Sequence, residues 1–394
     1  MNLLDLGHGR FLLLLSLGPL LMTLPLAYRR WLFTVISASV FMLALPDWRT
    51  RMAVVVFMLL PLLQLRWFRT RPIGPMVALL VLLFIWLNGY IRTALAADSI
   101  LGAAHVLGLS YILFREIDVL VFSTGYEAEA EPINVIEYFG FLMSFWTILA
   151  GPIQRYPAFV AALREPNAPQ LSESLRLLNR AINGLLKVLL FGTFLLRAAT
   201  VAGQHLSSSG LNALDFAVAF YGFAAYMYLN FSGYCDLVIA AAGWAGFTLP
   251  ENFNKPWLSR DMIEFWNRWH ITLSEWARDY MFQPLLKRWL RNPIERWPNA
   301  PQYAAIFVTF VVVGFWHGST SSWAIFGLFQ GVGVAWALAR RNRLQKKLGK
   351  QGYKVYNATV WRMWLGRAIC FHYICASFLF IGFAPETIAQ WVRL

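Results

Sequence analysis

The chain has 394 residues, of which 58% are hydrophobic and only 14% are charged, and its formal net charge is +14. Soluble globular domains carry about 25% charged residues, so this composition excludes a soluble protein and predicts a polytopic membrane protein. Lys and Arg lie mainly in short loops between apolar runs, where they set membrane topology and contact anionic membrane lipids. The positive charge therefore does not indicate a nucleic-acid partner.

Residues 1–98 are predicted to form scaffold helices separated by arginine-containing loops. The apolar runs are Phe11 to Ala27, Trp31 to Leu45, Met52 to Leu65 and Met76 to Leu87. We interpret the first run as a transmembrane helix rather than a signal peptide, because no cleavage site with a soluble domain follows it. Arg occurs in every connecting loop, so the positive-inside rule does not orient this region.

From residue 99 onward, charged residues begin to appear inside apolar segments. Arg115, Glu116 and Asp118 fall within one such segment, and we expect them to pair with one another. Ser123 to Glu131 is predicted to be a polar loop or a short re-entrant turn. Ile133 to Ala150 is then predicted to span the membrane.

The middle of the chain continues this pattern of spans and polar interruptions. Leu163 to Asn179 is predicted to be a linker, and spans are predicted over Ile182 to Ala202 and Ala213 to Leu229. Asn230 to Asp236 is interpreted as a polar turn, in which Asp236 caps the helix that follows.

The segment from Glu251 to Gly318 holds two of the six histidines, His270 and His317, and each follows a tryptophan. Apolar residues recur at helical spacing around His270 and predict one amphipathic helix. These residues are Trp266, Trp269, Leu273, Trp276 and Tyr280. Such a helix either lies at the membrane interface or turns its polar face toward a bundle interior or a water-filled cavity.

The second histidine follows a short apolar run. Gln302 to Trp316 has 15 residues, which is about 22 Å as a helix against about 30 Å of hydrocarbon. His317 is therefore expected inside the membrane, where Gly318 and small polar residues break the helix before a second run, Trp323 to Ala339. An ionisable side chain at such a break indicates a functional site.

Basic clusters flank this pair of spans. One cluster lies within Lys287–Arg296 and the other within Arg340–Lys354. Two crossings place both clusters on one face, which the positive-inside rule makes cytoplasmic. The His317 turn is then expected toward the extracytoplasmic side, and a last span, Ala368 to Phe383, is expected to leave the C-terminus outside.

Several motifs resemble those of the membrane-bound O-acyltransferase (MBOAT) family. They are LAGPIQRY, NFSGYCDLVIA, GFTLPENFNKPW, FWNRWHITLSEWARDY and GFWHG, whose histidine lies 47 positions after His270. The resemblance covers Gly108 to Phe383. The tail KVYNATVWRMWLGRAICFHYICASFLFIGF is most similar to the branch that transfers D-alanine to teichoic acid, followed by the alginate and peptidoglycan O-acetyltransferases.

This resemblance implies an all-α polytopic fold of roughly 11 to 13 transmembrane and re-entrant helices around a central tunnel or funnel. It implies one domain over residues 1–394, with the core at 99–383 and active-site motifs at 251–318. The implied location is the bacterial cytoplasmic (inner) membrane. The implied reaction moves an acyl group from a cytoplasmic thioester to a hydroxyl of a cell-surface polymer.

The same resemblance assigns roles to residues. His317 is expected to be the general base that deprotonates the hydroxyl, because a neutral imidazole suits this task. His270 is expected to orient the substrate, polarise the thioester carbonyl or stabilise the oxyanion. The expected substrate-binding residues are Asn267, Arg268, Trp269, Trp316 and Arg155.

The expected donor is a carrier-protein phosphopantetheine thioester or acetyl-CoA, and no permanently bound cofactor is expected. The expected partners are an acyl carrier protein on the cytoplasmic face and an extracytoplasmic SGNH-type or DltD-like protein. Cys235, Cys370 and Cys375 lie in apolar segments without metal-ligand spacing, so no metal site is expected.

Two other classes of protein remain alternatives. A transporter or channel would use the same buried charges along a permeation path, and its sign would be an internal repeat with broken helices in both halves. We find no such repeat. A structural scaffold would leave the His317 turn unexplained. The acyl group, D-alanyl or acetyl, is left open.

Overall fold

The structure, a computed structural model, describes residues 26–45, 47–68, 70–87, 108–124, 133–148, 150–165, 169–291, 299–318 and 320–393. Within these ranges the regular elements are helices, and β-type pairing is limited to an isolated bridge between Phe253 and Trp269. Five of the described helices are long and apolar enough to cross a membrane: Trp48–Trp67, Leu171–Ser209, Ala300–His317, Ser321–Ala358 and Val360–Gly382. The prediction of an all-α polytopic membrane protein is confirmed.

The chain forms two compact units, and each unit combines two stretches of sequence. The first unit holds residues 1–184 and 234–250, and the second holds residues 185–233 and 251–394. The predicted division of one domain into a scaffold at 1–98 and a core at 99–383 stays a prediction.

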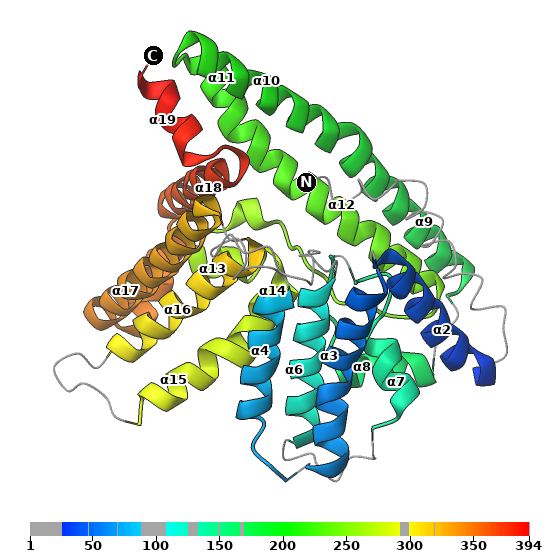
Figure 1. The fold of residues 1–394 in the computed structure, drawn as a ribbon. Coiled ribbons are helices and arrows are strands. Elements are labelled where there is room, and N and C mark those ends of the chain that lie inside the picture. The colour runs from blue at the N-terminus through cyan, green and yellow to red at the C-terminus, as the bar shows by residue number, and fades with distance from the viewer. Residues whose placement is uncertain are drawn as a thin grey trace. The chain divides into compact units, whose positions relative to one another are not determined.

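In the first unit, α3, α4 and α6 lie side by side, and α2 packs against α7 and α8 (Figure 1). The predicted spans between Trp31 and Leu87 are confirmed as helices, whereas most of the run Phe11 to Ala27 lies outside the described residues. The helices of this unit are α2 (Leu26–Ala44), α3 (Trp48–Trp67), α4 (Gly74–Leu87), α6 (Leu109–Thr124), α7 (Val135–Leu142), α8 (Tyr156–Arg164), nearly all of α9 (Leu171–Leu185) and the end of α12 (Phe223–Trp244).

The charged residues of α6 are buried, but they do not pair with one another as predicted. Arg115 donates to the carbonyl of Leu142 at 2.7 Å. Asp118 accepts from Arg155 at 3.0 Å and from the backbone N–H of Tyr156 at 2.6 Å. Neighbouring side chains on a helix point in different directions, so each charge meets a different element.

Ile133 to Ala150 does not span a membrane, contrary to the prediction. Among the described residues of this run only α7 is helical, and its eight residues measure about 12 Å. The side chain of Asn134 caps the start of α7 by accepting from the N–H of Ile136 at 2.9 Å. Arg115 satisfies the carbonyl of the last helical residue, so both ends of this short helix are capped inside the unit.

Helix α12 runs without interruption through Asn230 to Asp236, so the predicted polar turn and the capping role of Asp236 are wrong. Asp236 instead accepts from Arg180 of α9 at 2.9 Å. This ion pair with α9 stabilises the Asp236 carboxylate in the middle of α12, so the helix continues past it. The predicted linker Leu163 to Asn179 is likewise partly helical, because α9 begins at Leu171.

The second unit carries both histidine segments. Its π-helical pieces are η1 (Leu186–Gly192), η2 (Val218–Gly222) and η4 (Arg278–Phe282), and its short 3-10 helix is η3 (Pro256–Leu258). Its α-helices, besides the start of α12, are α10 (Thr193–Ser209), α11 (Ala213–Ala217), α13 (Met262–Trp266), α14 (Ile271–Ala277), α15 (Gln283–Trp289), α16 (Ala300–His317), α17 (Ser321–Ala358), α18 (Val360–Gly382) and α19 (Pro385–Arg393).

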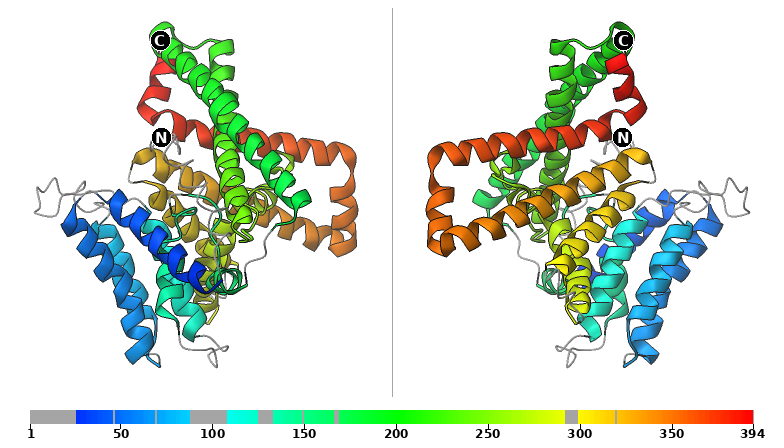
Figure 2. Two further views of the ribbon diagram at one scale, coloured as in Figure 1. Left: turned by 90° about the vertical axis from the view of Figure 1, so that its right-hand side faces the viewer. Right: turned by 90° about the vertical axis from the view of Figure 1, so that its left-hand side faces the viewer.

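Helices α16, α17 and α18 form two successive hairpins (Figure 2). At the first crossing the backbones touch, since a Cβ on Gly327 would lie 2.7 Å from the carbonyl oxygen of Phe310. Gly349 then breaks α17 with φ of +70°, and α18 returns antiparallel to it. The close α16–α17 hairpin places His317 at its turn, as the sequence predicted.

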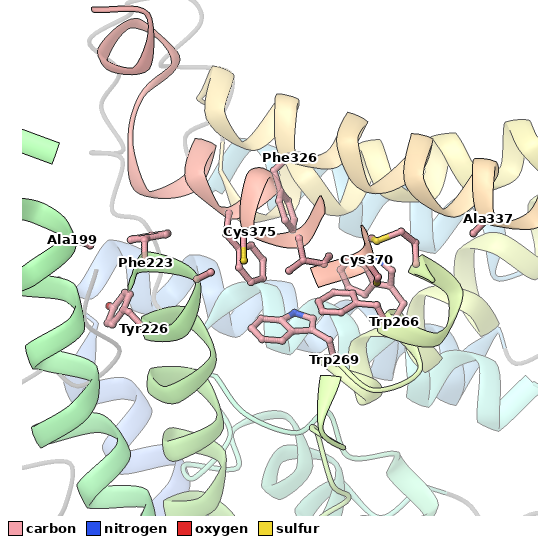
Figure 3. Packing of buried hydrophobic residues seen from close by; sticks show 14 residues of the cluster. Ala199, Phe223, Tyr226, Trp266, Trp269, Phe326, Ala337, Cys370 and Cys375 are labelled. Atoms are coloured by element: carbon pink, nitrogen blue, oxygen red, sulfur yellow. The ribbon is translucent and has the colours of Figure 1, made fainter. Parts of the chain in front are cut away.

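An aromatic core joins these hairpins to the His270 segment. Trp266 and Trp269 are buried in one cluster with Phe326 of α17 (Figure 3). Phe378 of α18 belongs to the same cluster. The ring of Trp269 lies 5.1 Å from that of Phe378. Large aromatic groups bury the most apolar area per side chain, so this cluster fixes the helices around the two histidines.

Candidate active site

His270 lies in a turn, not in the single amphipathic helix that the sequence predicted. The helix ends at Trp266, and a new helix begins at Ile271. His270 itself adopts a left-handed conformation with φ of +44°. Two backbone hydrogen bonds stabilise this turn. The N–H of Asn254 donates to the carbonyl of Arg268 at 2.9 Å, and the N–H of Ile271 donates to the carbonyl of Asn252 at 3.1 Å.

This correction has a physical reason. Local periodicity favours a continuous helix, but the extended segment 252–254 pairs with the backbone of 268–271 and satisfies its polar groups outside a helix. A non-glycine residue at positive φ is strained, and it persists only where its surroundings fix it. The turn directs Trp269 into the aromatic core, so this residue is buried as the predicted helix also required.

Asn252 fixes the hydrogen-bonding state of the His270 ring. Its Oδ1 accepts from the backbone N–H of Thr272 at 3.2 Å and from the Thr272 hydroxyl at 2.9 Å. The atom facing these donors is therefore oxygen, which cannot donate. Since Nδ1 of His270 lies 3.2 Å from the same oxygen, Nδ1 carries the proton and Nε2 carries a free lone pair.

The environment of His270 keeps its imidazole neutral. The residue is only 4% exposed, and the ring of Phe231 lies 4.8 Å from it, edge to face. His270 is outside the five candidate spans. Burial, followed by the nearby imidazole of His317, lowers the pKa of His270 to about 3. The two histidines are therefore close enough to interact, and His270 is a neutral group at physiological pH.

His317 is the last residue of α16, and two tryptophans pack against its ring. The ring stacks on Trp323 with centroids 4.8 Å apart and an interplanar angle of 16°. Trp316 lies 4.3 Å away in a tilted arrangement. A Cβ at Gly318 would collide with the Trp323 ring, so glycine permits this stack.

A cavity of about 460 Å³ lies beside the two histidine segments in the same unit. Its walls come from α13, α14, η4, α16 and α17. Ile271, the residue after His270, lines the cavity. Val313, about one helical turn before His317, also lines it. Arg278, Arg341 and Glu275 also line it, so the cavity combines an apolar wall with two cationic groups and one acidic group.

The structure gives most of the predicted substrate-binding residues a packing role. Arg268 pairs with Glu264 at 2.8 Å, and Trp269 lies in the aromatic core. Trp316 packs on His317. Asn267 differs, because it lines the cavity beside the turn. Substrate contacts by these four residues stay predictions.

Arg155 belongs to the other unit, where it is part of the ion pair with Asp118. Its predicted contact with substrate stays a prediction as well.

Metal binding has no support in the described part of the chain, since no group of three His, Cys, Asp or Glu side chains is arranged there to hold an ion.

Sequence reasoning missed two polar contacts that organise the site. In the sequence Asn252 is only one residue of the motif GFTLPENFNKPW, and the motif assigns it no role. Gln330 is fully buried in α17, where it accepts from the Trp266 indole at 3.1 Å and donates to Ser377 at 2.8 Å. A lone amide in an apolar run was the available signal, because such groups need partners inside a membrane protein.

The sequence matches the membrane-bound O-acyltransferase family over residues 29–380. The chain belongs to this family. It is therefore a multi-pass membrane acyltransferase, and the transporter and scaffold alternatives do not hold.

Several relatives in the MBOAT family align with most of the length of this chain. The teichoic acid D-alanyltransferase of Streptococcus thermophilus is 31% identical over 295 residues, which cover 72% of this chain and 69% of the relative. The enzyme of that name from Bacillus subtilis is 31% identical over 288 residues, covering 71% and 69%. The probable alginate O-acetylase AlgI of Pseudomonas syringae pv. tomato is 28% identical over 284 residues, covering 68% and 52%.

Proposed function

We propose that this MBOAT protein transfers a D-alanyl group from a thioester donor to a hydroxyl of a cell-surface polymer. The support is the similarity to teichoic acid D-alanyltransferases, which extends over 69% of each of the two relatives. Acetyl transfer is the second candidate, because the alginate O-acetylase relative matches 68% of this chain. The proposed location is the bacterial cytoplasmic membrane.

The observation that carries this proposal is the pair of positioned imidazoles. In the proposed reaction, Nε2 or Nδ1 of His317 takes the proton of the acceptor hydroxyl as its oxygen attacks the thioester carbonyl. The tetrahedral intermediate then expels the thiolate, which recovers the proton from His317. No proton is gained or lost overall, and an ester replaces the thioester.

His270 is proposed to orient the acceptor through a second hydroxyl of the polymer, because the attacking hydroxyl donates its single proton to His317. Its Nδ1 proton is committed to Asn252, so a neutral His270 has only the Nε2 lone pair to offer. A lone pair accepts a hydrogen bond but cannot stabilise an oxyanion. This geometry favours orientation of the substrate over the two other roles expected for His270.

The cavity of about 460 Å³ is the proposed site for the acyl arm of the donor. The two candidate donors are a carrier-protein phosphopantetheine thioester and acetyl-CoA. Each carries a phosphate and a narrow, mostly neutral arm. Arg278, which also pairs with Asp279 at 3.0 Å, would attract the phosphate, and the apolar wall would accept the arm. An acyl carrier protein and an extracytoplasmic SGNH-type or DltD-like protein are the proposed partners.

The test is donor consumption by purified protein in liposomes, followed as thiol release. D-alanyl-loaded carrier protein should release thiol in the presence of a polyol phosphate acceptor. His317→Ala should reduce the rate by about 100-fold or more. The control is His205→Ala, which removes an exposed imidazole on α10.

Two outcomes would redirect or reject the proposal. Thiol release from acetyl-CoA, but not from the D-alanyl carrier, would establish the acetyltransferase alternative. His317→Ala turnover above about a tenth of wild type would remove the general-base role, since such a base contributes at least 10²-fold.

A further inference from the structure

A second cavity, of about 770 Å³, lies at the other end of the α17–α18 hairpin from His317. Helices α13, α17 and α18 line it, in the region where the chain turns between α17 and α18 (Figure 2). Neither histidine lines this cavity. The proposed acyl transfer leaves its chemistry unexplained.

Three guanidinium groups face this cavity without an acidic partner among the described residues. Among the described residues Arg340 meets only Tyr356: it donates to the hydroxyl at 3.4 Å and lies 5.8 Å from the ring centre. Arg362 stacks over the Tyr356 ring, with its guanidinium carbon 4.0 Å from the ring centre. Arg341 makes no hydrogen bond or ion pair with described residues. Three such cations in one cavity attract an anion strongly.

The acidic residues of the cavity do not neutralise these arginines. Glu264 accepts from Arg260 at 2.8 Å and from Arg268 at 2.8 Å. Asp261 caps α13 by accepting from the N–H of Glu264 at 2.8 Å. Both carboxylates are thus used within the α13 segment, and the arginines of α17 and α18 remain available.

An apolar face continues from the charged end of the cavity along α18. Trp361, Leu365 and Ile369 line the cavity and are 61%, 50% and 52% exposed. Their spacing of four residues places them on one face of α18, which is long and apolar enough to cross a membrane. The cavity therefore combines an anion-binding end with an apolar path open to lipid.

We propose that this cavity binds an anionic phospholipid. Its phosphate would contact Arg340, Arg341 and Arg362, because guanidinium groups match phosphate geometry. One acyl chain would lie along Trp361, Leu365 and Ile369. An acidic soluble protein would use the charged end but would leave this apolar face uncovered, so the combined surface favours a lipid.

The lipid would also support the segment that leads to His270. Met262 and Asn267, at the two ends of the α13 segment, line the same cavity. Helix α13 has only five residues, which is too short to be stable without packing. A bound lipid would supply part of that packing. The proposal does not depend on acyl transfer, because its test measures binding.

The first test uses unmodified protein in detergent and measures its melting temperature. Dihexanoyl phosphatidylglycerol should raise the melting temperature in a saturable manner, because a ligand of the folded state stabilises it. Dihexanoyl phosphatidylcholine and inorganic phosphate should not. An equal shift with phosphatidylcholine would reject the charge-specific site, and an equal shift with inorganic phosphate would reject the lipid.

The second test compares two triple variants by native mass spectrometry with phosphatidylglycerol. Arg340→Gln, Arg341→Gln and Arg362→Gln together should reduce lipid retention by about tenfold or more. The control removes the same charge with Lys346→Gln, Lys347→Gln and Lys350→Gln, which lie outside the cavity on exposed parts of α17. The control should retain the lipid.

Equal loss in both triple variants would reduce the effect to general charge attraction and overturn the proposal. Stabilisation of the wild-type protein by an acidic carrier protein, without stabilisation by phosphatidylglycerol, would identify the surface as a protein-docking site instead. If the arginine variant does not fold, the comparison of phosphatidylglycerol with phosphatidylcholine on unmodified protein still decides the question.

Discussion

Asn252 determines what His270 can do chemically. The side-chain oxygen of Asn252 accepts from both donors of Thr272, and this leaves Nδ1 of His270 as a donor. The tautomer of the candidate catalytic histidine is therefore fixed by a residue 18 positions away in the sequence. Such a residue positions a catalytic group without touching the substrate.

We expect Asn252→Ala to lower acyl transfer by about 100-fold, because a misplaced catalytic group loses about that much. Asn252→Asp should recover part of the rate, since it restores an acceptor oxygen for Nδ1. Rates are measured as thiol release from the donor. Equal activity of the alanine variant and wild type would show that the tautomer does not matter.

The buried histidine also predicts a pH dependence of stability. The pKa of His270 is about 3 in the folded protein, against 6.5 as its ordinary value. Below pH 6.5 the unfolded chain binds a proton that the folded chain does not bind, so stability is lost as the pH falls. Wild type should lose about 2 kcal/mol more than His270→Gln between pH 7.5 and pH 5.

Chemical unfolding in detergent, followed by tryptophan fluorescence, measures this difference. His317 is present in both proteins, so the comparison reports the removal of His270. Identical pH profiles for the two proteins would mean that His270 is solvated and free to ionise.

Glu116 and Asp118 provide a matched pair of buried carboxyl groups. Within the described residues, the Glu116 oxygens accept no hydrogen bond, and an unpartnered buried carboxyl group is favoured as the neutral acid. Glu116→Gln should therefore change the free energy of unfolding by less than about 1 kcal/mol. Asp118→Asn should cost about 3 kcal/mol, because it leaves Arg155 without its charge partner. A larger cost for Glu116→Gln would indicate an ionised Glu116.

At the scale of elements, glycines set the distance between α16 and α17. A Cβ on Gly327 would lie 2.7 Å from the Phe310 carbonyl oxygen and 3.1 Å from Gly314 Cα. Backbone atoms cannot move aside as a flexible side chain can. Close backbone contact through small residues is a common way for membrane helices to associate. The His317 turn is held by this contact.

We expect Gly327→Ala to destabilise the protein by about 1–3 kcal/mol, as overpacking does. It should also reduce acyl transfer, because the hairpin that carries His317 would open. The control is Gly74→Ala at the start of α4, where a Cβ would meet no atom within 4 Å. Thermal melting of both variants provides the comparison, and an equal effect of the two substitutions would contradict the close contact.

At the scale of the whole molecule, orientation in the membrane follows from charge. The basic cluster in Arg340–Lys354 is expected on the cytoplasmic face. Gln345→Cys should then react with an impermeant thiol reagent only after the inner membrane is opened. Thr320→Cys, three residues after His317, should react slowly in intact cells. Labelling of Gln345→Cys in intact cells would reverse the orientation.

The natural cysteines do not interfere with this experiment. Cys235, Cys370 and Cys375 are all buried. Two further positions, Asn292 and Ser319, suit the same test by sequence but lie outside the described residues. A chain that keeps its three cysteines serves as the unlabelled control.

The sequence by itself determined the class of protein, the helices between Trp31 and Leu87 and the two histidine segments. Hydropathy indicates a membrane protein, because long apolar helices lose contact with water on insertion, but it does not decide every segment, since the apolar run Ile133 to Ala150 does not span. The Trp–His pairs and the family motifs singled out His270 and His317, and the short run before His317 predicted the hairpin turn at which α16 ends.

Only the tertiary structure decided how the polar residues are used. Periodicity predicted one helix through His270, but pairing with Asn252 and Asn254 breaks it. Asp236 is predicted to cap a helix by its local sequence, but in the fold it accepts from Arg180 of α9. Local sequence reports the preferences of a segment, whereas a buried polar group takes whichever partner the fold brings within hydrogen-bond distance. That partner comes from far along the chain, and single-segment reasoning does not contain it.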